Sequence, residues 1–389
     1  MNVARTAIVL GAGTGGIAAA NEIRKCCEKN DRVLLVDRNE RFLFAPSLLW
    51  LAVGARRSKE IQRPVRELVR SGVDFHCGAI ESIDPASRTI ALDGRTMSAD
   101  ALVVALGASL APESIPGLAQ AGHNFYTLAG AESLRDALAA FRGGRVLVLT
   151  ASPAYKCPAA PYEAALLIDA FLRKRALREQ SAIAMYAAEA APMAVAGPAI
   201  SAAVVAMLGE KGIVYAPNRQ ILSADPATNV VTFADGSSET YDLLAYVPPH
   251  RPPSALAGSG LVGENGWIPV DRATLQTPFA GVYAIGDNAT IALQMGKPLP
   301  KAGVFAYAQA RIVARNIADE WRGGAALARF DGHGACFVET GGMKAAMGSG
   351  NFFAEPTPTI ALRPPSLWVH LAKVLVERRG LGKWPFFWR

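Results

Sequence analysis

The sequence is poor in cysteine and has no concentrated charge, and each shortage excludes a class of protein. Its five cysteines in 389 residues form no CxxC pair, so neither a structural disulfide scaffold nor a zinc site is indicated. The net charge is +7, but no block of five or more like charges occurs, which argues against nucleic acid as a partner. No apolar run reaches the roughly 20 residues that a membrane-spanning helix requires. No signal peptide precedes the first expected strand, so we expect a protein that stays in the cytoplasm.

What the sequence does have is enough apolar material for more than one core. Hydrophobic residues make up 51% of the chain and charged residues 19%, so burial is ample and disorder is not expected. The length suits two nucleotide-type domains followed by a tail. The predicted fold class is α/β, with two Rossmann-like dinucleotide-binding domains and a C-terminal region. We expect one domain from 1–110 with 265–320, a second from 111–264, and the C-terminal region from 321–389.

The first forty residues carry the strongest motif. An apolar strand over 5–10 is followed by GAGTGG, which places Gly11, Gly13 and Gly16 at the GxGxxG spacing. A helical stretch and a second apolar strand follow, and that strand ends in Asp37. The first glycine permits a tight turn, the second lets the backbone approach a pyrophosphate, and the third lets helix and strand pack closely. A carboxylate at this distance accepts hydrogen bonds from ribose hydroxyls, so the motif predicts a bound dinucleotide.

Three later segments complete this predicted site. A buried strand ends at Gly107, where a glycine lets the chain turn beside the nucleotide. Another apolar strand ends at Gly286 and Asp287, and this carboxylate can accept a hydrogen bond from a hydroxyl of the cofactor's long arm. A helix is expected from about Gly303, and its positive end would stabilise an anionic cofactor ring, to which Lys301 could add a full charge. A solvent-facing lysine is the alternative for that residue.

A second strand and helix follow in the middle of the chain, but without the phosphate-binding turn. Where glycines would bring backbone N–H groups to a pyrophosphate, the chain has Pro153, Pro158 and Pro161, which donate no hydrogen bond. A bound nicotinamide dinucleotide is therefore not expected here. The turn offers Cys157 instead, and a rigid turn beside Lys156 could hold a thiolate with a depressed pKa.

The C-terminal region combines a glycine-rich hairpin with an aromatic end. Apolar and polar residues alternate over 330–353, which is typical of a hairpin, and this one carries Cys336 and Phe337. The end begins as a helix, and the last residues include Trp384, Phe386, Phe387 and Trp388 among basic residues. Four large aromatic side chains are costly to expose, which favours monotopic attachment to a membrane surface. A dimer contact is the alternative.

These residues resemble the sulfide:quinone oxidoreductase family and its relative, the flavoprotein subunit of flavocytochrome c sulfide dehydrogenase. Both have the two-dinucleotide-domain fold of the flavin disulfide reductases. The shared motifs are GAGTGG with Asp37, PSLLWLAVG, ALVVALGA, KCPAAPYEAA, YAIGDNA, PKAGVFAYAQA, GACFVETG and WVHLAK. KCPAAPYEAA and GACFVETG are the specific ones, whereas GAGTGG and the IGD of YAIGDNA occur in many flavoenzymes.

The resemblance implies that Cys157 and Cys336 are a redox pair at the flavin. In that family sulfide attacks a disulfide or trisulfide and leaves a persulfide on one cysteine, and the other thiolate passes two electrons to the flavin. Glu163 could serve as the proton acceptor. A carboxylate placed to favour the helix dipole is an equal alternative for this residue.

The sequence departs from the family in ways that change the expected mechanism, flavin linkage and electron acceptor. Several members have a third cysteine and a histidine where this chain has Tyr126 and Gly130, so a mechanism with three cysteines is not expected. The flavocytochrome subunit attaches its flavin to a cysteine near the segment that corresponds to 42–47, and there is none here. FAD is therefore expected to be non-covalent. That subunit is also exported, and this sequence shows no export signal. We expect both differences to favour a quinone over cytochrome c as the acceptor.

For the quinone, the resemblance suggests a slot formed by Phe337 with Phe352 or Phe386, because an aromatic pair can sandwich a planar ring. The implied partners are sulfide, ubiquinone or menaquinone, and the membrane surface. The implied state is a homo-oligomer, peripheral and monotopic on the inner membrane.

Three other functions stay open at this stage. The first is the flavoprotein subunit of a sulfide dehydrogenase that passes electrons to cytochrome c. The second is a type II NADH:quinone oxidoreductase, which predicts a second glycine-rich phosphate loop. The third is a non-catalytic flavin redox sensor in which the cysteine pair is a switch.

Overall fold

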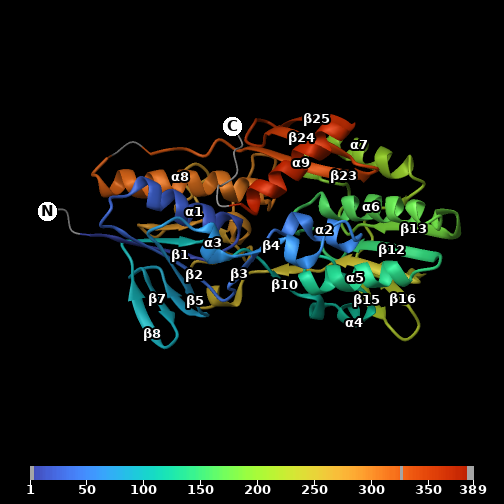
Figure 1. Cartoon of the computed structure of the whole chain (residues 1–389), viewed down its shortest axis with the longest axis horizontal. Helices are drawn as coiled ribbons and strands as arrows, with labels where there is room; N and C mark the ends of the chain where they lie inside the picture. The colour runs from blue at the N-terminus through green and yellow to red at the C-terminus, as the bar shows by residue number, and fades with distance from the viewer. Residues whose placement is uncertain (1–3, 325–326, 383–389) are drawn as a thin grey trace.

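The computed structural model describes residues 4–324 and 327–382. Two lobes lie side by side along the long axis of the molecule, and the C-terminal strands and last helix lie across one side of it (Figure 1). The N-terminal part of the chain and a later return of it build the first lobe, while the middle of the chain builds the second. Both lobes contain a parallel sheet, which confirms the predicted α/β class.

The first lobe contains a five-stranded parallel sheet. In spatial order its strands are β21 (Val282–Ala284), β9 (Ala101–Val104), β1 (Thr6–Leu10), β2 (Arg32–Asp37) and β5 (Val73–Cys77). The elements that cover it are the helices α1 (Thr14–Cys26) and α8 (Gly303–Trp321) and the antiparallel strands β6 (Ile80–Asp84), β7 (Thr89–Leu92) and β8 (Arg95–Ser98). The helix expected from about Gly303 does begin there.

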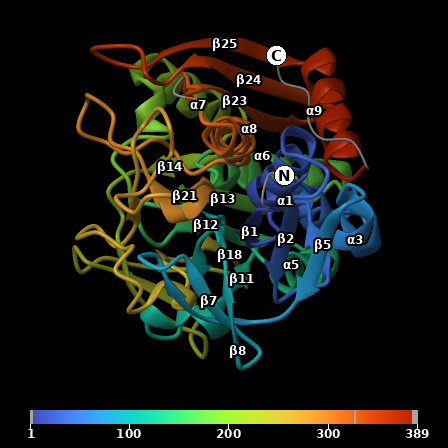
Figure 2. The same cartoon turned by 90° about the vertical axis from the view of Figure 1, so that its left-hand side faces the viewer.

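The two faces of this sheet bury alternate residues of the same apolar strands. Ala7 and Val9 of β1 join the core beneath α1 and α8, whereas Ile8 and Leu10 pack with the β6–β8 meander. Figure 2 shows the helices on one side of the sheet and β7 and β8 on the other. Because successive residues of a strand face opposite sides, a sheet covered on both faces requires continuous apolar strands such as these.

The second lobe repeats this arrangement. Its parallel sheet has the order β11 (His123–Asn124), β18 (Leu243–Val247), β12 (Gly144–Thr150), β13 (Ser181–Tyr186) and β14 (Val214–Ala216). One face is covered by α5 (Leu128–Ala140), α6 (Ala160–Lys174) and α7 (Pro198–Gly209). The other face is covered by α4 (Leu118–Ala121) and the meander β15 (Ile221–Asp225), β16 (Val230–Phe233) and β17 (Ser238–Thr240).

A C-terminal sheet and helix span both lobes. The antiparallel strands β23 (His333–Gly341), β24 (Lys344–Asn351) and β25 (Thr359–Ser366) lead into α9 (Leu367–Gly380). Glycines let β23 approach each lobe closely. A Cβ on Gly334 would lie 2.3 Å from the ring of Phe305 on α8, and one on Gly341 would lie 2.3 Å from Ala170 on α6. This strand therefore holds the predicted redox residue Cys336 between the two lobes.

Short elements complete the fold. They are β3 (Arg41–Leu43), α2 (Leu48–Ala52), β4 (Gln62–Pro64), α3 (Val65–Leu68), β10 (Ser109–Leu110), β19 (His250–Arg251), β20 (Ile268–Pro269) and β22 (Ala289–Thr290). Within 4–324 and 327–382, none of the helices has both the length and the apolar character needed to cross a membrane.

Candidate functional site

Two of the three glycines of the first turn are required by close backbone contacts. Gly11 has φ +99°, and a Cβ there would lie 2.4 Å from the carbonyl oxygen of Ala105. A Cβ on Gly16 would lie 1.7 Å from the carbonyl oxygen of Gly11. At Gly13, in contrast, a Cβ would meet no atom within 4 Å. Two of the glycines thus serve packing, while the middle one faces open space at the N-terminus of α1, where a phosphate would be bound.

Asp37 ends β2 and holds this turn in place. One carboxylate oxygen accepts a hydrogen bond from the backbone N–H of Ala12 at 2.6 Å, and the other accepts one from Asn39 at 2.7 Å. The acid is therefore at the edge of the sheet beside the glycine turn, as the motif predicts. Its hydrogen bond to a ribose stays a prediction.

Asn288 ties together the two later turns of the site and was missed by sequence reasoning. Its side chain accepts a hydrogen bond from the Gly107 N–H and donates one to the Val104 carbonyl, both at 3.1 Å. It is fully buried. The only signal in the sequence is its position directly after Asp287. These bonds bring the Gly107 turn and the Asp287 turn to the same edge of the sheet.

A pocket opens beside these turns. Its lining includes Gly286, Lys301, Phe305 and Gln309. Together with the open space at Gly13 and the uncapped N-terminus of α1, it offers room and backbone donors for an elongated, phosphate-bearing cofactor. The residues present therefore fit a flavin dinucleotide.

Lys301 faces the protein rather than the solvent. Its ammonium donates hydrogen bonds to the carbonyls of Asp287 at 2.6 Å and Ala289 at 3.2 Å. It also lies 3.6 Å from the centre of the Trp267 ring, a cation–π contact. Burial lowers the pKa of this amine to about 8, and Asp287 acts in the opposite direction. The solvent-facing alternative for Lys301 is therefore wrong.

The turn that carries Cys157 is held by hydrogen bonds to its backbone from both lobes. The Cys157 N–H donates to the Lys301 carbonyl at 2.7 Å. The hydroxyl of Tyr126 donates to the carbonyls of Lys156 at 2.9 Å and Cys157 at 3.2 Å. The cysteine itself has φ +52°, an uncommon conformation for a residue other than glycine. Such conformations cluster at functional sites and persist only where the surroundings impose them.

The tertiary fold brings Cys157 and Cys336 into one environment. Both are free thiols, and both pack against the same apolar core of the second lobe. They also share two charged neighbours, since Glu163 and Lys373 influence the ionisation of each thiol. The second lobe supplies the first cysteine and the bridging strand β23 supplies the other.

The expectation of a depressed thiol pKa is wrong. Burial raises the pKa of Cys336 to about 11, and the carboxylate of Glu163 acts in the same direction. The pKa of Cys157 is raised further, first by burial and then by the charges of Cys336 and Glu163. The rigid turn beside Lys156 does not offset these effects, because removal from water disfavours the charged form of a thiol.

Glu163 lies in the first turn of α6 and forms a buried ion pair with Lys373 of α9. Burial raises the pKa of this carboxyl group, while the Lys373 ammonium acts to lower it. The ammonium also lies 4.9 Å from the centre of the Trp50 ring. Sequence reasoning missed Lys373, because nothing in a helix near the chain end indicates a partner more than 200 positions earlier.

The predicted quinone residues lie in different surroundings. Phe337 follows Cys336 on β23 and is partly buried. Phe352 follows β24 and is buried in the first lobe's core, where its ring meets that of Phe305 edge to face at 5.0 Å. Phe386 lies outside the described residues. The role of these three in quinone binding stays a prediction.

The edge of the second sheet that would hold a nicotinamide nucleotide is occupied by side chains. Glu189 lies three residues after the end of β13. Its carboxylate accepts hydrogen bonds from Thr150 at 2.6 Å and from the hydroxyls of Tyr155 and Tyr162. An acid that already accepts three hydroxyl groups has little capacity left for a ribose.

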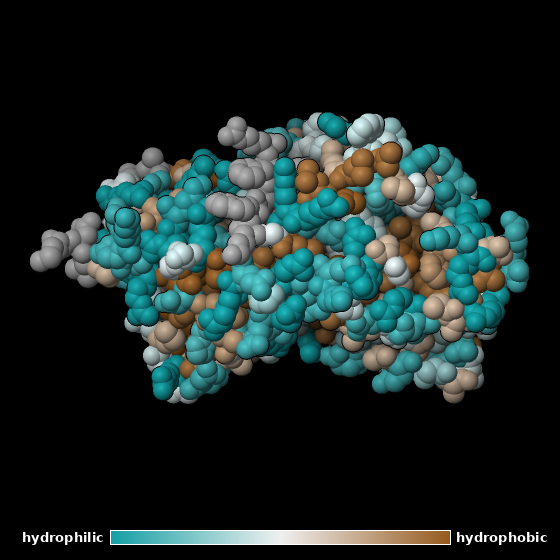
Figure 3. All heavy atoms as spheres, viewed as in Figure 1, coloured by the Kyte–Doolittle hydropathy of each residue, from teal (hydrophilic) through white to brown (hydrophobic). Residues whose placement is uncertain are grey.

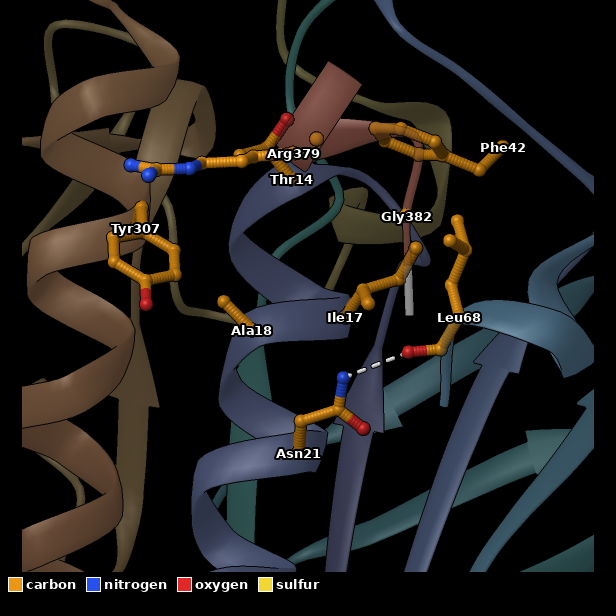
Figure 4. Close-up of a pocket in the computed structure, with 10 residues that line it drawn as sticks. Thr14, Ile17, Ala18, Asn21, Phe42, Leu68, Tyr307, Arg379 and Gly382 are labelled. Atoms are coloured by element: carbon orange, nitrogen blue, oxygen red, sulfur yellow. Dashed lines mark hydrogen bonds between the residues drawn. The ribbon is translucent and has the colours of Figure 1, made fainter. Parts of the chain in front are cut away.

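A second pocket lies between α1, α8 and the end of α9. Figure 4 shows Arg379 extending past Tyr307 on one side and the Asn21 amide donating to the Leu68 carbonyl on the other. The lining consists of Thr14, Ile17, Ala18, Asn21, Phe42, Leu68, Tyr307, Arg379, Gly380 and Gly382. The pocket is mostly apolar, with one guanidinium supplied by the C-terminal helix.

Within the described part of the chain, no group of acids, histidines and cysteines could hold a metal ion.

Comparisons with known proteins agree with this geometry. The chain is 27% identical over 367 residues to the mitochondrial sulfide:quinone oxidoreductase of Mus musculus, covering 90% of this chain and 79% of that protein. It is 24% identical over 406 residues to the sulfide-quinone reductase of Aquifex aeolicus, covering 98% and 91% of the two chains. The crystal structure of the sulfide:quinone oxidoreductase from Aquifex aeolicus has the same fold, with a TM-score of 0.87 at 23% identity over 97% of this chain and 92% of that one. Residues 5–310 match the family described as pyridine nucleotide-disulphide oxidoreductase, and the chain belongs to that family.

Proposed function

We propose that the protein is an FAD-dependent enzyme that oxidises sulfide and passes the electrons to a quinone. The named relatives support this reaction, and the chain covers 79% of the mouse protein and 91% of the Aquifex protein. The observation that carries the proposal is the shared environment of Cys157 and Cys336, which come from different parts of the fold and have Glu163 and Lys373 as common neighbours.

FAD would bind non-covalently along the edge of the first sheet. The turn at Gly11 to Gly16 and the N-terminus of α1 would hold the pyrophosphate, Asp37 the ribose, and the turns at Gly107 and Asp287 the remaining length. When bound, FAD accepts an electron pair from sulfur and gives it to the quinone. Segment 42–47 contains no cysteine that could form a covalent link.

The cysteine pair would carry the sulfur chemistry. In the oxidised enzyme a disulfide links Cys157 and Cys336, and hydrosulfide attacks one of its sulfur atoms. One S–S bond forms and one breaks, which leaves a persulfide on one cysteine and a thiolate on the other. Glu163, when ionised, would accept the persulfide proton. The thiolate would then donate an electron pair to the bound flavin.

NADH is not favoured as the electron donor. Pro153 and Pro158 take the place of phosphate-binding glycines in the 151–158 turn, and Glu189 is committed to three hydroxyl groups. Both features oppose a second dinucleotide at the second sheet, which a type II NADH:quinone oxidoreductase would require.

The protein would take up its quinone from a membrane, to which the exposed face of α9 would bind. α9 exposes four large apolar side chains, which are Leu367, Trp368, Leu371 and Leu375, at 45%, 79%, 41% and 46%. Figure 3 shows hydrophobic atoms gathered over α9 with hydrophilic residues around them. Such a stripe, ending in Arg378 and Arg379, suits peripheral binding to an anionic lipid surface. We place the protein on the inner membrane, with ubiquinone or menaquinone as acceptor.

The pocket in Figure 4, beside the last turn of α9, would suit an apolar electron acceptor such as a quinone. It is formed in part by the last turn of α9 and contains the aromatic rings of Phe42 and Tyr307. Pockets of this lining bind planar or chain-like apolar groups.

Stopped-flow measurement of flavin absorbance tests the proposal. We expect sulfide to bleach the flavin of the holoenzyme within one turnover, and a soluble quinone to restore the colour. NADH should leave the flavin oxidised. Reduction by NADH and not by sulfide would favour the NADH:quinone reaction, and slow reduction by both would favour a redox sensor.

A further inference from the structure

Three side chains on one face of α9 reach into the protein. Lys373 pairs with Glu163 of α6, His370 contacts Glu339 of β23 at 3.0 Å, and Glu377 pairs with Arg56 at 2.7 Å. Lys373 and Glu377 are 7% and 5% exposed. A buried lysine loses its hydration, so its position has to be justified by the charges around it.

Several charged and aromatic groups lie near Lys373. Glu163 lies on α6, the Trp50 ring on α2, and the His370–Glu339 pair on α9 and β23. Glu163 lies at the start of α6, six residues after Cys157, and α6 packs against β23, the strand that carries Cys336. Glu163 acts to raise the pKa of both thiols and Lys373 acts to lower it, while Asp287 also raises that of Cys157. Lys373 is the positive charge among these contributions, and a hydrogen bond from the Phe337 backbone also acts to lower the pKa of Cys336.

We propose that Lys373 is a positioning residue that supplies the fixed positive charge for the thiol pair. It holds the Glu163 carboxyl group in an ion pair and acts to lower the pKa of that group, and it stabilises the thiolate that forms when the Cys157–Cys336 bond opens. The role in sulfide oxidation rests on the proposed function, whereas the effect on the thiols is a property of the fold alone.

The same helix offers a matched control for a merely structural role. Glu377 lies one turn beyond Lys373 and also forms a buried ion pair, with hydrogen bonds from Arg56 and from Ser47 at 2.6 Å. Either pair could attach α9 to the rest of the protein. The Glu377 pair is not among the main influences on the ionisation of Cys157 or Cys336.

The test measures thiol reactivity, which does not depend on sulfide turnover. Holoenzyme reduced with dithiothreitol is treated with iodoacetamide at several pH values, and the rate for each cysteine is obtained by mass spectrometry of its peptide. Cys77, on β5 in the first lobe, is the internal reference. We expect Lys373→Met to slow alkylation of Cys157 and Cys336 relative to Cys77 by about tenfold or more, because each pKa unit changes the thiolate fraction tenfold. Lys373→Arg and Glu377→Gln should retain the normal ratio.

A second comparison covers the case in which Lys373→Met does not fold because Glu163 loses its partner. Glu163→Gln should make both thiols more reactive than in the native protein, and adding Lys373→Met should remove this gain. Equal reactivity in the single and double variants would overturn the proposal, as would an unchanged ratio in folded Lys373→Met. If the reactivities change as expected but sulfide never bleaches the flavin, the charge effect stands and the sulfide reaction does not.

Discussion

At the scale of single residues, Cys157 is positioned by its backbone and not by its side chain. Its N–H donates to the Lys301 carbonyl, and its own carbonyl accepts from the Tyr126 hydroxyl. Its positive φ is imposed by these contacts. A side chain of similar size should therefore adopt the same turn, so the thiol can be removed without moving the residues that would hold FAD.

We predict that Cys157→Ser retains FAD and loses sulfide-driven flavin reduction. A serine hydroxyl cannot form the disulfide or the persulfide, so the rate should fall by at least about 10³-fold, the scale on which loss of a covalent nucleophile acts. Stopped-flow absorbance of the flavin measures this rate, and the ratio of flavin to protein absorbance measures retention. Cys77→Ser, on β5, is the control and should react normally. An unchanged rate in Cys157→Ser would remove Cys157 from the mechanism.

The residue types at this site were predictable, but their ionisation was not. The motifs around Cys157 and Cys336 placed both in one environment, and Glu163 was expected nearby. The pKa of the thiols depends on burial and on Lys373, which comes from a helix far along the chain. A local pattern cannot report either quantity, and for this reason the expectation of a depressed pKa from Lys156 and the prolines was wrong.

At the scale of elements, α9 has two faces with different tasks. His370, Lys373 and Glu377 recur at the spacing of one helix face and reach three separate parts of the protein. The exposed apolar side chains occupy the other face, where Trp368 and Leu371 are 79% and 41% exposed. Residues three and four apart share a helix face, so substitutions on one face leave the other face intact.

We predict that Trp368→Ser with Leu371→Ser weakens binding to anionic lipid vesicles. Burial of one large apolar side chain stabilises by roughly 1.5–3 kcal/mol, so losing two should reduce binding by about a hundredfold or more. Flotation with vesicles measures the effect, and sulfide-driven flavin reduction in solution should not change. Leu222→Ser is the matched control, because Leu222 is 59% exposed on β15 of the second lobe. Equal flotation of the double variant and the native protein would contradict a lipid-binding role for this face.

Most elements near the first motif could be predicted, while the last strand could not. The strand, glycine turn, helix and second strand lie where the motif predicts, with β2 ending at Asp37. β25 was not expected, because it contains Pro364 and Pro365. It is an edge strand of its sheet, and prolines are tolerated there because one side of an edge strand needs no ladder hydrogen bonds.

At the scale of the whole molecule, the two lobes share one architecture, but the turns that follow their sheet strands differ. The first sheet ends in glycine turns with open space at Gly13, and the second ends in a proline-rich turn and the Glu189 cluster. The parallel sheets were predictable from their apolar strands. The bridging by β23 and α9 was not, because the contacts that they make join residues hundreds of positions apart, as Lys373 and Glu163 do.

The end of the chain supports a prediction about attachment of the whole protein. Residues 383–389 lie outside the described residues, but their sequence holds four large aromatic side chains directly after a helix with an exposed apolar face. Burial of only two of them would contribute about 3 kcal/mol, which is more than a hundredfold in binding. Deleting 383–389 should therefore release the protein from membranes in a pelleting assay. Sulfide should still reduce the flavin of the shortened chain, because Cys157, Cys336 and Lys373 all precede the cut. If the shortened chain pellets with lipid as strongly as the full chain, the tail is not the anchor, and the exposed face of α9 has to account for binding alone.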